Sequence, residues 1–312
     1  MSSANTRSNV IAITGATGSQ GGAVARALLA EGRHTVRVLV RSPPSASQAI
    51  TDLAAAGAQI AVADLDSPDA LEHALRGVYG LFSVQAMDNG SDSERRHADH
   101  LVRAARSTGV RQVVHASVSK TGSYEQFPGW GTGRWNEKYW THKRYAEDAI
   151  TNGGFESWTL LRPTFFMDNF LPPKAAALYM GLESGKIPVV FRPDRKLQFI
   201  DVADTGAFAR AAFNEPARFR QQAIDLAGDE LTIEEIVHEL TRVTGKRVDV
   251  DHVTEKEAVA QGMFAALANY QEWTNVVGYT VDIAALRTWG IPLTSFATFF
   301  ARNREVLFRY LR

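Results

Sequence analysis

Residues 9–22, Asn-Val-Ile-Ala-Ile-Thr-Gly-Ala-Thr-Gly-Ser-Gln-Gly-Gly, decide the fold. The apolar half is continuous and β-branched, which is typical of a strand buried on both faces. Gly15, Gly18 and Gly21 then form a Gly-x-x-Gly-x-x-Gly turn, and residues 23–31 place apolar side chains on one face of a helix that Gly32 ends. Strand, turn and helix predict half of a dinucleotide-binding βαβ unit, with the pyrophosphate on bare backbone at the helix N-terminus.

Arg41 indicates which dinucleotide is bound. It follows the next predicted strand, residues 34–40, and stands 20 positions after Gly21. NAD-binding chains carry Asp or Glu at about this distance to bind the ribose 2′-hydroxyl. A guanidinium instead pairs with a 2′-phosphate through charge-assisted hydrogen bonds. The alternative is a solvated arginine at a strand end, but beside the glycine turn we interpret Arg41 as evidence for NADP(H).

The composition excludes several classes of protein. The 312 residues carry 34 basic and 34 acidic side chains, so no global positive field draws the chain to nucleic acid or an anionic membrane. The absence of cysteine excludes disulfides, thiolate zinc sites and a cysteine nucleophile. Residues 1–9 are polar and no apolar segment is long enough to span a bilayer. We therefore expect a cytoplasmic protein with neither a nucleic-acid nor a membrane partner.

Strand and helix patterns alternate through the first half of the chain. Strands are expected at 59–64, 80–84 and 112–117, and helices at 70–75 and 92–108. This alternation predicts an α/β fold with a Rossmann-type, doubly wound parallel sheet.

The pattern changes after the strand expected at 157–163. The later elements are strands at 186–191 and 223–226 and an amphipathic helix over 232–240 with Thr232 as its N-cap. We expect an NADP(H)-binding domain over 1–155 and a smaller C-terminal α/β substrate- or partner-binding region over 156–312. No linker separates the two, so we expect the second region to be interleaved with the first and docked on it.

Five motifs together resemble the short-chain dehydrogenase/reductase superfamily, and more closely its atypical NmrA-like (HSCARG-like) branch. In chain order they are residues 15–22, residues 36–41, Asp64-Leu65, Leu161-Arg162-Pro163 with Asp168-Asn169, and residues 199–204. The resemblance covers most of the chain. It implies a Rossmann fold, NADP(H) as cofactor, and either an oxidoreductase or a redox sensor.

The resemblance also implies where the cofactor is held. Residues 17–21 would hold the pyrophosphate and Arg41 the 2′-phosphate. The cofactor contacts in this turn are Gly15, Thr17, Gly18, Ser19, Gln20 and Gly21. Asp64 and Leu65 would hold the adenine, although Asp64 has an alternative role as a strand-end cap. The remaining contacts, around the nicotinamide ribose and the crevice, are Ser83, Val84, Gln85, Lys143, Pro163 and Phe166.

The catalytic residues implied by the resemblance are Tyr139, Lys143 and Ser117. Tyr139 and Lys143 are four residues apart, which places them on one face of a helix, where the ammonium can stabilise a phenolate. Ser117 would hold the substrate oxygen, with Ser119 as the alternative on the same strand face. Tyr139 could instead pack against neighbouring tryptophans, and the serine could satisfy backbone groups at the strand end.

The segment from Tyr124 to Tyr139 is rich in aromatic residues, glycine and proline. It could form a lid over a partly apolar, uncharged substrate, an interface with another protein, or a surface loop packed on its own rings. A helix expected over 296–311 could close the crevice or join two subunits, and core packing is the default. A homodimer or a regulatory partner protein therefore stays open.

Other chemistries find little support. His97 and His100 are three residues apart on a predicted helix, but their charged neighbours favour a solvated face over a metal site. No Gly-x-Ser-x-Gly nucleophile elbow occurs. We expect no metal.

Two functions remain: an NADPH-dependent reductase acting on a carbonyl, imine or conjugated double bond, and an NADP(H)-sensing regulatory protein without turnover.

Overall fold

A computed structural model describes residues 9–41, 43, 47–87 and 91–312 of the chain. The chain divides into two compact units, each assembled from three segments. The first unit consists of residues 1–121, 138–162 and 205–224, and the second of residues 122–137, 163–204 and 225–312. The single division expected after residue 155 is coarser than this partition, because the chain passes from one unit to the other five times.

The first unit contains a seven-stranded sheet in the order β10-β6-β5-β4-β1-β2-β3. Its strands are β1 (Val10–Ile13), β2 (Thr35–Val40), β3 (Gln59–Val62), β4 (Gly80–Ser83), β5 (Gln112–Ala116), β6 (Ser157–Pro163) and β10 (Gln222–Leu226). The pairs from β3 to β6 are parallel. The strand order reverses between β1 and β4, which confirms the doubly wound Rossmann-type sheet and places a ligand crevice at the carboxyl ends of these two strands.

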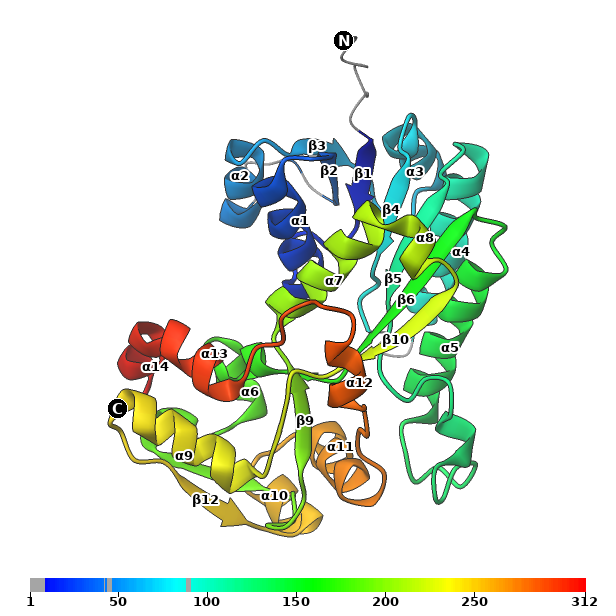
Figure 1. Cartoon of the computed structure of the whole chain (residues 1–312). Helices are drawn as coiled ribbons and strands as arrows, with labels where there is room; N and C mark the ends of the chain where they lie inside the picture. The colour runs from blue at the N-terminus through cyan, green and yellow to red at the C-terminus, as the bar shows by residue number, and fades with distance from the viewer. Residues whose placement is uncertain (1–8, 42, 44–46, 88–90) are drawn as a thin grey trace. The chain divides into compact units, whose positions relative to one another are not determined.

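Helices cover both faces of this sheet (Figure 1). They are α1 (Ser19–Glu31), α2 (Gln48–Ala55), α3 (Pro68–Leu75), α4 (Ser93–Ser107), α5 (Glu137–Thr151), α7 (Val202–Asn214) and α8 (Pro216–Phe219). On one face, Leu71, Leu101 and Ile150 of α3, α4 and α5 pack on inward side chains of the strands. On the other, α7 lies against α1, because a Cβ at Gly206 would stand only 2.8 Å from the Ala23 carbonyl oxygen. Burial on both faces explains the continuous apolar strands of the sequence.

The second unit is built on two small sheets with short helices. The sheets are ordered β11-β9-β7 and β12-β8. The strands are β7 (Phe165–Phe166), β8 (Lys186–Val189), β9 (Leu197–Ile200), β11 (Asp229–Leu231) and β12 (Asp249–His252). The α-helices are α6 (Lys174–Leu178), α9 (Ile233–Thr244), α10 (Glu255–Ala260), α11 (Ala265–Val276), α12 (Ile283–Arg287), α13 (Phe296–Arg302) and α14 (Arg304–Tyr310). Short 3₁₀ helices are η2 (Tyr124–Gln126), η3 (Met167–Phe170) and η4 (Leu182–Ser184).

An aromatic cluster forms the core of this second unit. Phe170 stacks on Tyr179 with ring centroids 3.9 Å apart and meets Phe296 and Phe300 edge-on. Phe296, Phe299 and Phe300 of α13 are all fully buried. Core packing, the default expectation for this part of the chain, is therefore the role of α13.

Two local expectations have opposite outcomes. Thr232 is confirmed as the N-cap of α9, where its hydroxyl accepts from the Glu235 backbone N–H and the Glu235 carboxylate accepts from the Thr232 N–H. The single helix expected over 296–311 is wrong, because the chain forms α13 and α14 with a break at Asn303. The Asn303 amide donates to the Phe299 carbonyl oxygen, a local side-chain bond that competes with helix continuation.

None of the helices in the described ranges is both long and apolar enough to cross a membrane.

Candidate active site

The glycine turn joins β1 to α1 in the first unit, as predicted. Gly15 has φ +63°, in the left-handed region, and a Cβ there would meet Val84 Cγ1 at 2.7 Å. A Cβ at Gly21 would lie 2.4 Å from the carbonyl oxygens of both Thr14 and Gly15. Only glycine fits at these two positions without moving the turn.

The N-terminus of α1 fits a pyrophosphate. Gly18 is the N-cap and has no side chain with which to cap the helix, and the first turn of the helix contains no acid. Thr17 is exposed, Ser19 and Gln20 are half-buried, and the buried Gln20 Oε1 accepts no hydrogen bond in the described part of the chain. Bare backbone and the positive end of the helix dipole are what a phosphate group needs here.

Arg41 and the segment Asp64–Asp66 follow the ends of β2 and β3. Arg41 is exposed, and Asp64 Oδ1 accepts from the Asp66 backbone N–H at 2.9 Å. Asp64 therefore has the strand-end capping role that was the alternative interpretation of the sequence. Its adenine-binding role stays a prediction. Leu65 is half-buried beside it.

Three side chains of α4 fix this turn. Arg96 Nε lies 2.7 Å and His97 Nε2 3.1 Å from Asp66 Oδ1, and together they lower the pKa of Asp66 to about 2. His100 Nδ1 donates to the Leu65 carbonyl oxygen at 2.7 Å. The two histidines therefore contact the Asp64–Asp66 turn. The solvated helix face expected from the sequence does not account for these contacts.

Side chains at the ends of β4 and β5 form a buried chain. Gln85 Nε2 donates to Ser83 Oγ at 2.9 Å, and Ser83 Oγ lies 3.3 Å from His115 Nδ1. Burial, assisted by the positive charge of Lys143, lowers the pKa of His115 to about 3, so this imidazole is neutral at physiological pH. On the β1 side, Thr14 Oγ1 accepts from the Val84 N–H and donates to the Val84 carbonyl oxygen.

Tyr139 and Lys143 lie on one face of α5, also in the first unit. Lys143 Nζ is 5.7 Å from the centroid of the half-buried Tyr139 ring. Tyr139 also meets Trp140 edge-on at 5.2 Å, which is part of the packing alternative. Lys143 is buried and ion-paired, with 2.6 Å between its Nζ and Glu94 Oε1 of α4.

The other candidate hydroxyl groups are those of Ser117, Ser119 and Tyr145. Ser117 and Ser119 are both buried, and Ser117 Oγ lies 3.3 Å from Thr121 Oγ1. Burial alone does not separate the two serines. Tyr145 donates to both carboxylate oxygens of Asp99, and this bond raises the pKa of the Tyr145 phenol. Tyr145 is therefore a poor proton donor, which leaves Tyr139 as the candidate tyrosine of this helix.

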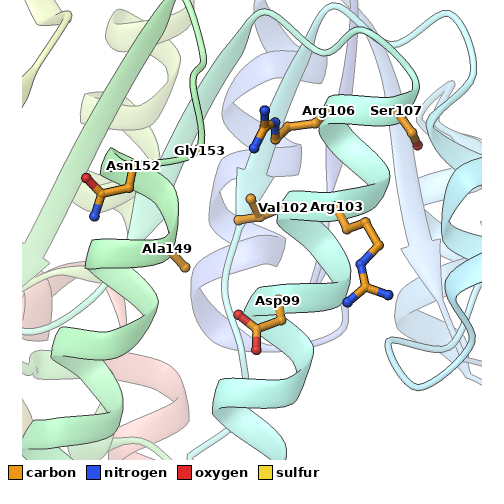
Figure 2. A pocket seen from close by; sticks show the side chains of 8 residues that line it. All are labelled: Asp99, Val102, Arg103, Arg106, Ser107, Ala149, Asn152 and Gly153. Atoms are coloured by element: carbon orange, nitrogen blue, oxygen red, sulfur yellow. The ribbon is translucent and has the colours of Figure 1, made fainter.

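A hollow between α4 and α5 contains none of the predicted site residues (Figure 2). It is lined by Asp99, Val102, Arg103, Arg106, Ser107, Ala149, Asn152 and Gly153. The guanidinium groups of Arg103 and Arg106 point in different directions in Figure 2, so they do not form a common anion cradle.

The aromatic segment that could form a lid, an interface or a self-packed loop belongs to the second unit up to Glu137. Phe127 packs edge-on against Trp273 of α11 at 5.6 Å, and Trp135 Nε1 donates to the Pro128 carbonyl oxygen. Tyr124 and Trp130 are in ring contact at 4.7 Å. Three roles were open for this segment. Its contacts within the second unit favour the third, a loop packed on its own rings and on α11.

Pro163 and Phe166 are assigned to the second unit. Pro163 ends β6 and is buried, and Phe166 is half-buried in β7, where it pairs with Ile200 of β9. Their assignment to the cofactor stays a prediction. No group of three metal-binding side chains that could hold an ion occurs among the described residues.

Comparison with known proteins identifies the class. The chain belongs to the NmrA-like family, whose profile matches residues 7–292. An NmrA-like family domain-containing oxidoreductase, FrzB from a Cladobotryum species, is 30% identical over 76% of this chain and 74% of its own. Quinone oxidoreductase 2 of Escherichia coli K12 is 29% identical over 80% of each chain. The crystal structure of the E. coli NADPH-dependent quinone oxidoreductase complexed with NADPH aligns with a TM-score of 0.76 and 26% identity, covering 94% of this chain and 99% of that one.

Sequence reasoning missed Glu94, His115 and Thr14. Glu94 belongs to the strongly charged stretch Ser93-Glu94-Arg95-Arg96, which reads as an exposed helix surface. His115 and Thr14 each stand at a strand end, which is the one signal that could have singled them out.

Proposed function

We propose that this protein is an NADPH-dependent reductase that transfers a hydride to a small, partly apolar acceptor. One arrangement carries the proposal: Tyr139 and Lys143 share a face of α5, with Nζ 5.7 Å from the phenol ring, in the same compact unit as the open glycine turn. A protein that only bound a dinucleotide would need the turn and a cation, but not a phenol beside that cation.

Each group has a role in this proposal. The α1 N-terminus binds the pyrophosphate, Arg41 binds the 2′-phosphate, and Lys143 donates to the ribose hydroxyls. When bound, NADPH supplies the hydride. Tyr139 Oη donates the proton to the substrate heteroatom, and the nearby ammonium stabilises the phenolate that remains. Ser117 Oγ holds the substrate oxygen through a hydrogen bond.

The acceptor class follows from the groups present. Tyr139 is the proton donor in this proposal, so the acceptor must take up one hydride and one proton. Carbonyl, imine and conjugated quinone-like compounds meet this requirement, because the negative charge that develops can be protonated by Tyr139. The names of the quinone oxidoreductase and oxidoreductase relatives support the same class.

The test is steady-state oxidation of NADPH with a panel of quinones, imines, aldehydes and ketones, followed by loss of reduced-nicotinamide absorbance. We expect turnover with at least one acceptor and its loss, by about a hundredfold, in Tyr139→Phe without a change in NADPH affinity. Tight NADPH binding with no turnover on the whole panel would refute the reductase and favour an NADP(H)-responsive regulatory protein. Turnover that Tyr139→Phe leaves unchanged would remove Tyr139 from its role.

A further inference from the structure

Glu94 is a buried carboxylate in the first turn of α4. It is 1% exposed, and its Oε1 lies 2.6 Å from Nζ of Lys143, which is 8% exposed. Both carboxylate oxygens are buried and neither accepts a hydrogen bond within the described ranges, so the contact with Lys143 is an ion pair. Lys143 is thus the ionic partner of Glu94.

Stability alone is a weak reason for this pair. Removing two charges from water costs free energy that their attraction only partly returns, so apolar side chains of similar volume would serve a helix contact as well or better. The contact between α4 and α5 also has other links: Asp92 Oδ1 lies 3.1 Å from Lys138 Nζ, and Tyr145 donates to Asp99. Glu94 is therefore not needed merely to join the two helices.

The location of Lys143 gives the pair a specific use. Its ammonium lies 5.7 Å from the Tyr139 ring centroid and close enough to His115, at the end of β5, to help lower the pKa of that imidazole. A lysine carries a point charge on a flexible four-carbon stem, so its ammonium must be held if it is to serve a ligand. The ammonium carries three N–H donors, and its ion pair with Glu94 leaves donors for other acceptors.

Asp92 does not compete for this ammonium. Its Oδ1 already lies 3.1 Å from Lys138 Nζ and 3.3 Å from His142 Nε2. We propose that Glu94 is a positioning residue that holds the Lys143 ammonium beside the Tyr139 ring, so that its remaining N–H groups bind the ribose of NADP(H). The inference rests on the cofactor role of Lys143 in the proposed function, and it concerns binding, which can be measured without turnover.

A double-mutant cycle on NADPH affinity tests the proposal. The dissociation constant is measured by the fluorescence of bound NADPH for wild type, Glu94→Gln, Lys143→Met and the double variant. If Glu94 acts through Lys143, Glu94→Gln weakens NADPH binding about tenfold in the wild-type background and less than twofold in Lys143→Met. Equal weakening in both backgrounds, or no weakening in either, overturns the proposal.

Glu147→Gln is the matched control. Glu147 is also an acid 2% exposed in the first unit, and it lies on α5 one turn beyond Lys143, where it is paired with Arg162. Glu147→Gln should lower the melting temperature yet leave NADPH affinity unchanged, because the cation that Glu147 pairs with is Arg162 and not Lys143. An equal loss of NADPH affinity in Glu147→Gln would show that any broken buried pair perturbs the site, and would overturn the specific role of Glu94.

Glu94→Asp covers the case in which Glu94→Gln does not fold. It keeps the charge but withdraws the carboxylate by one methylene group. NADPH affinity should again fall only when Lys143 is present, and an equal loss in Lys143→Met would contradict the proposal. The two proposals can fail separately. If wild type turns over no acceptor, but Glu94→Gln weakens NADPH binding only when Lys143 is present, the reductase is refuted and the Glu94 inference is supported.

Discussion

Gly21→Ala probes the turn on which cofactor binding depends. The added Cβ would lie 2.4 Å from two backbone oxygens, those of Thr14 and Gly15, where contacts below 3.0 Å essentially do not occur. Both carbonyl groups would have to move by at least about 0.6 Å, and neither can rotate away as a side chain does. Such overpacking typically costs about 1 to 3 kcal/mol of unfolding free energy.

The same displacement widens the turn that must approach the pyrophosphate. We expect NADPH affinity to fall by about tenfold or more, measured by fluorescence titration, and the unfolding free energy to fall by about 2 kcal/mol in urea. Gly32→Ala is the control at the other end of α1. Gly32 has φ +70° and open space around its Cβ position, so alanine there costs about 1 kcal/mol of stability without touching the turn.

The two variants together separate stability from binding. NADPH affinity should fall in Gly21→Ala and stay unchanged in Gly32→Ala. Normal NADPH affinity in Gly21→Ala would refute the reasoning that the close backbone approach at this glycine shapes the phosphate site.

Three further predictions address charge. Arg41→Glu should lower the preference for NADPH over NADH by about tenfold or more, because a charge-assisted bond to the 2′-phosphate becomes a repulsion; an unchanged ratio of the two dissociation constants would rule out the assignment. Glu147→Gln should lower the unfolding free energy by about 3 kcal/mol, since it leaves the mostly buried Arg162 without its carboxylate; a loss in chemical denaturation well below 1 kcal/mol would contradict this. Burial raises the pKa of Asp204 from 3.8 to about 6, so the folded chain keeps a proton that the unfolded chain loses and wild type loses stability as pH rises from 4 to 6. Asp204→Asn lacks this loss, so its unfolding free energy relative to wild type should rise by up to about 3 kcal/mol between pH 4 and pH 7, and a constant difference would exclude the shift.

Local signals made much of the fold predictable. The continuous apolar strands, the glycine turn and the Thr232 N-cap each depend on neighbours within a few residues, and each occurs where the sequence indicated. The break at Asn303 was not predicted, because apolar periodicity continues on both sides of it and the asparagine forms its own bond to the Phe299 carbonyl oxygen.

The site was only partly predictable for a different reason. The spacing of Tyr139 and Lys143 follows from helix geometry, whereas the burial of Glu94 depends on a cation supplied by a distant segment of the chain. In the same way, His97 and His100 look solvated by sequence, and their partners Asp66 and Leu65 come from another loop. Periodicity identifies which side chains share a face, but it does not identify what lies opposite.

Transfer of deuterium tests the central claim most directly. NADPH labelled at either face of nicotinamide C4 is incubated with the purified protein and an acceptor from the panel, and the NADP⁺ formed is analysed by mass spectrometry for retained deuterium. A reductase of the proposed kind should remove deuterium from one face only, and Tyr139→Phe should remove almost none in the same time. NADPH that binds but loses no label with any acceptor would contradict the account.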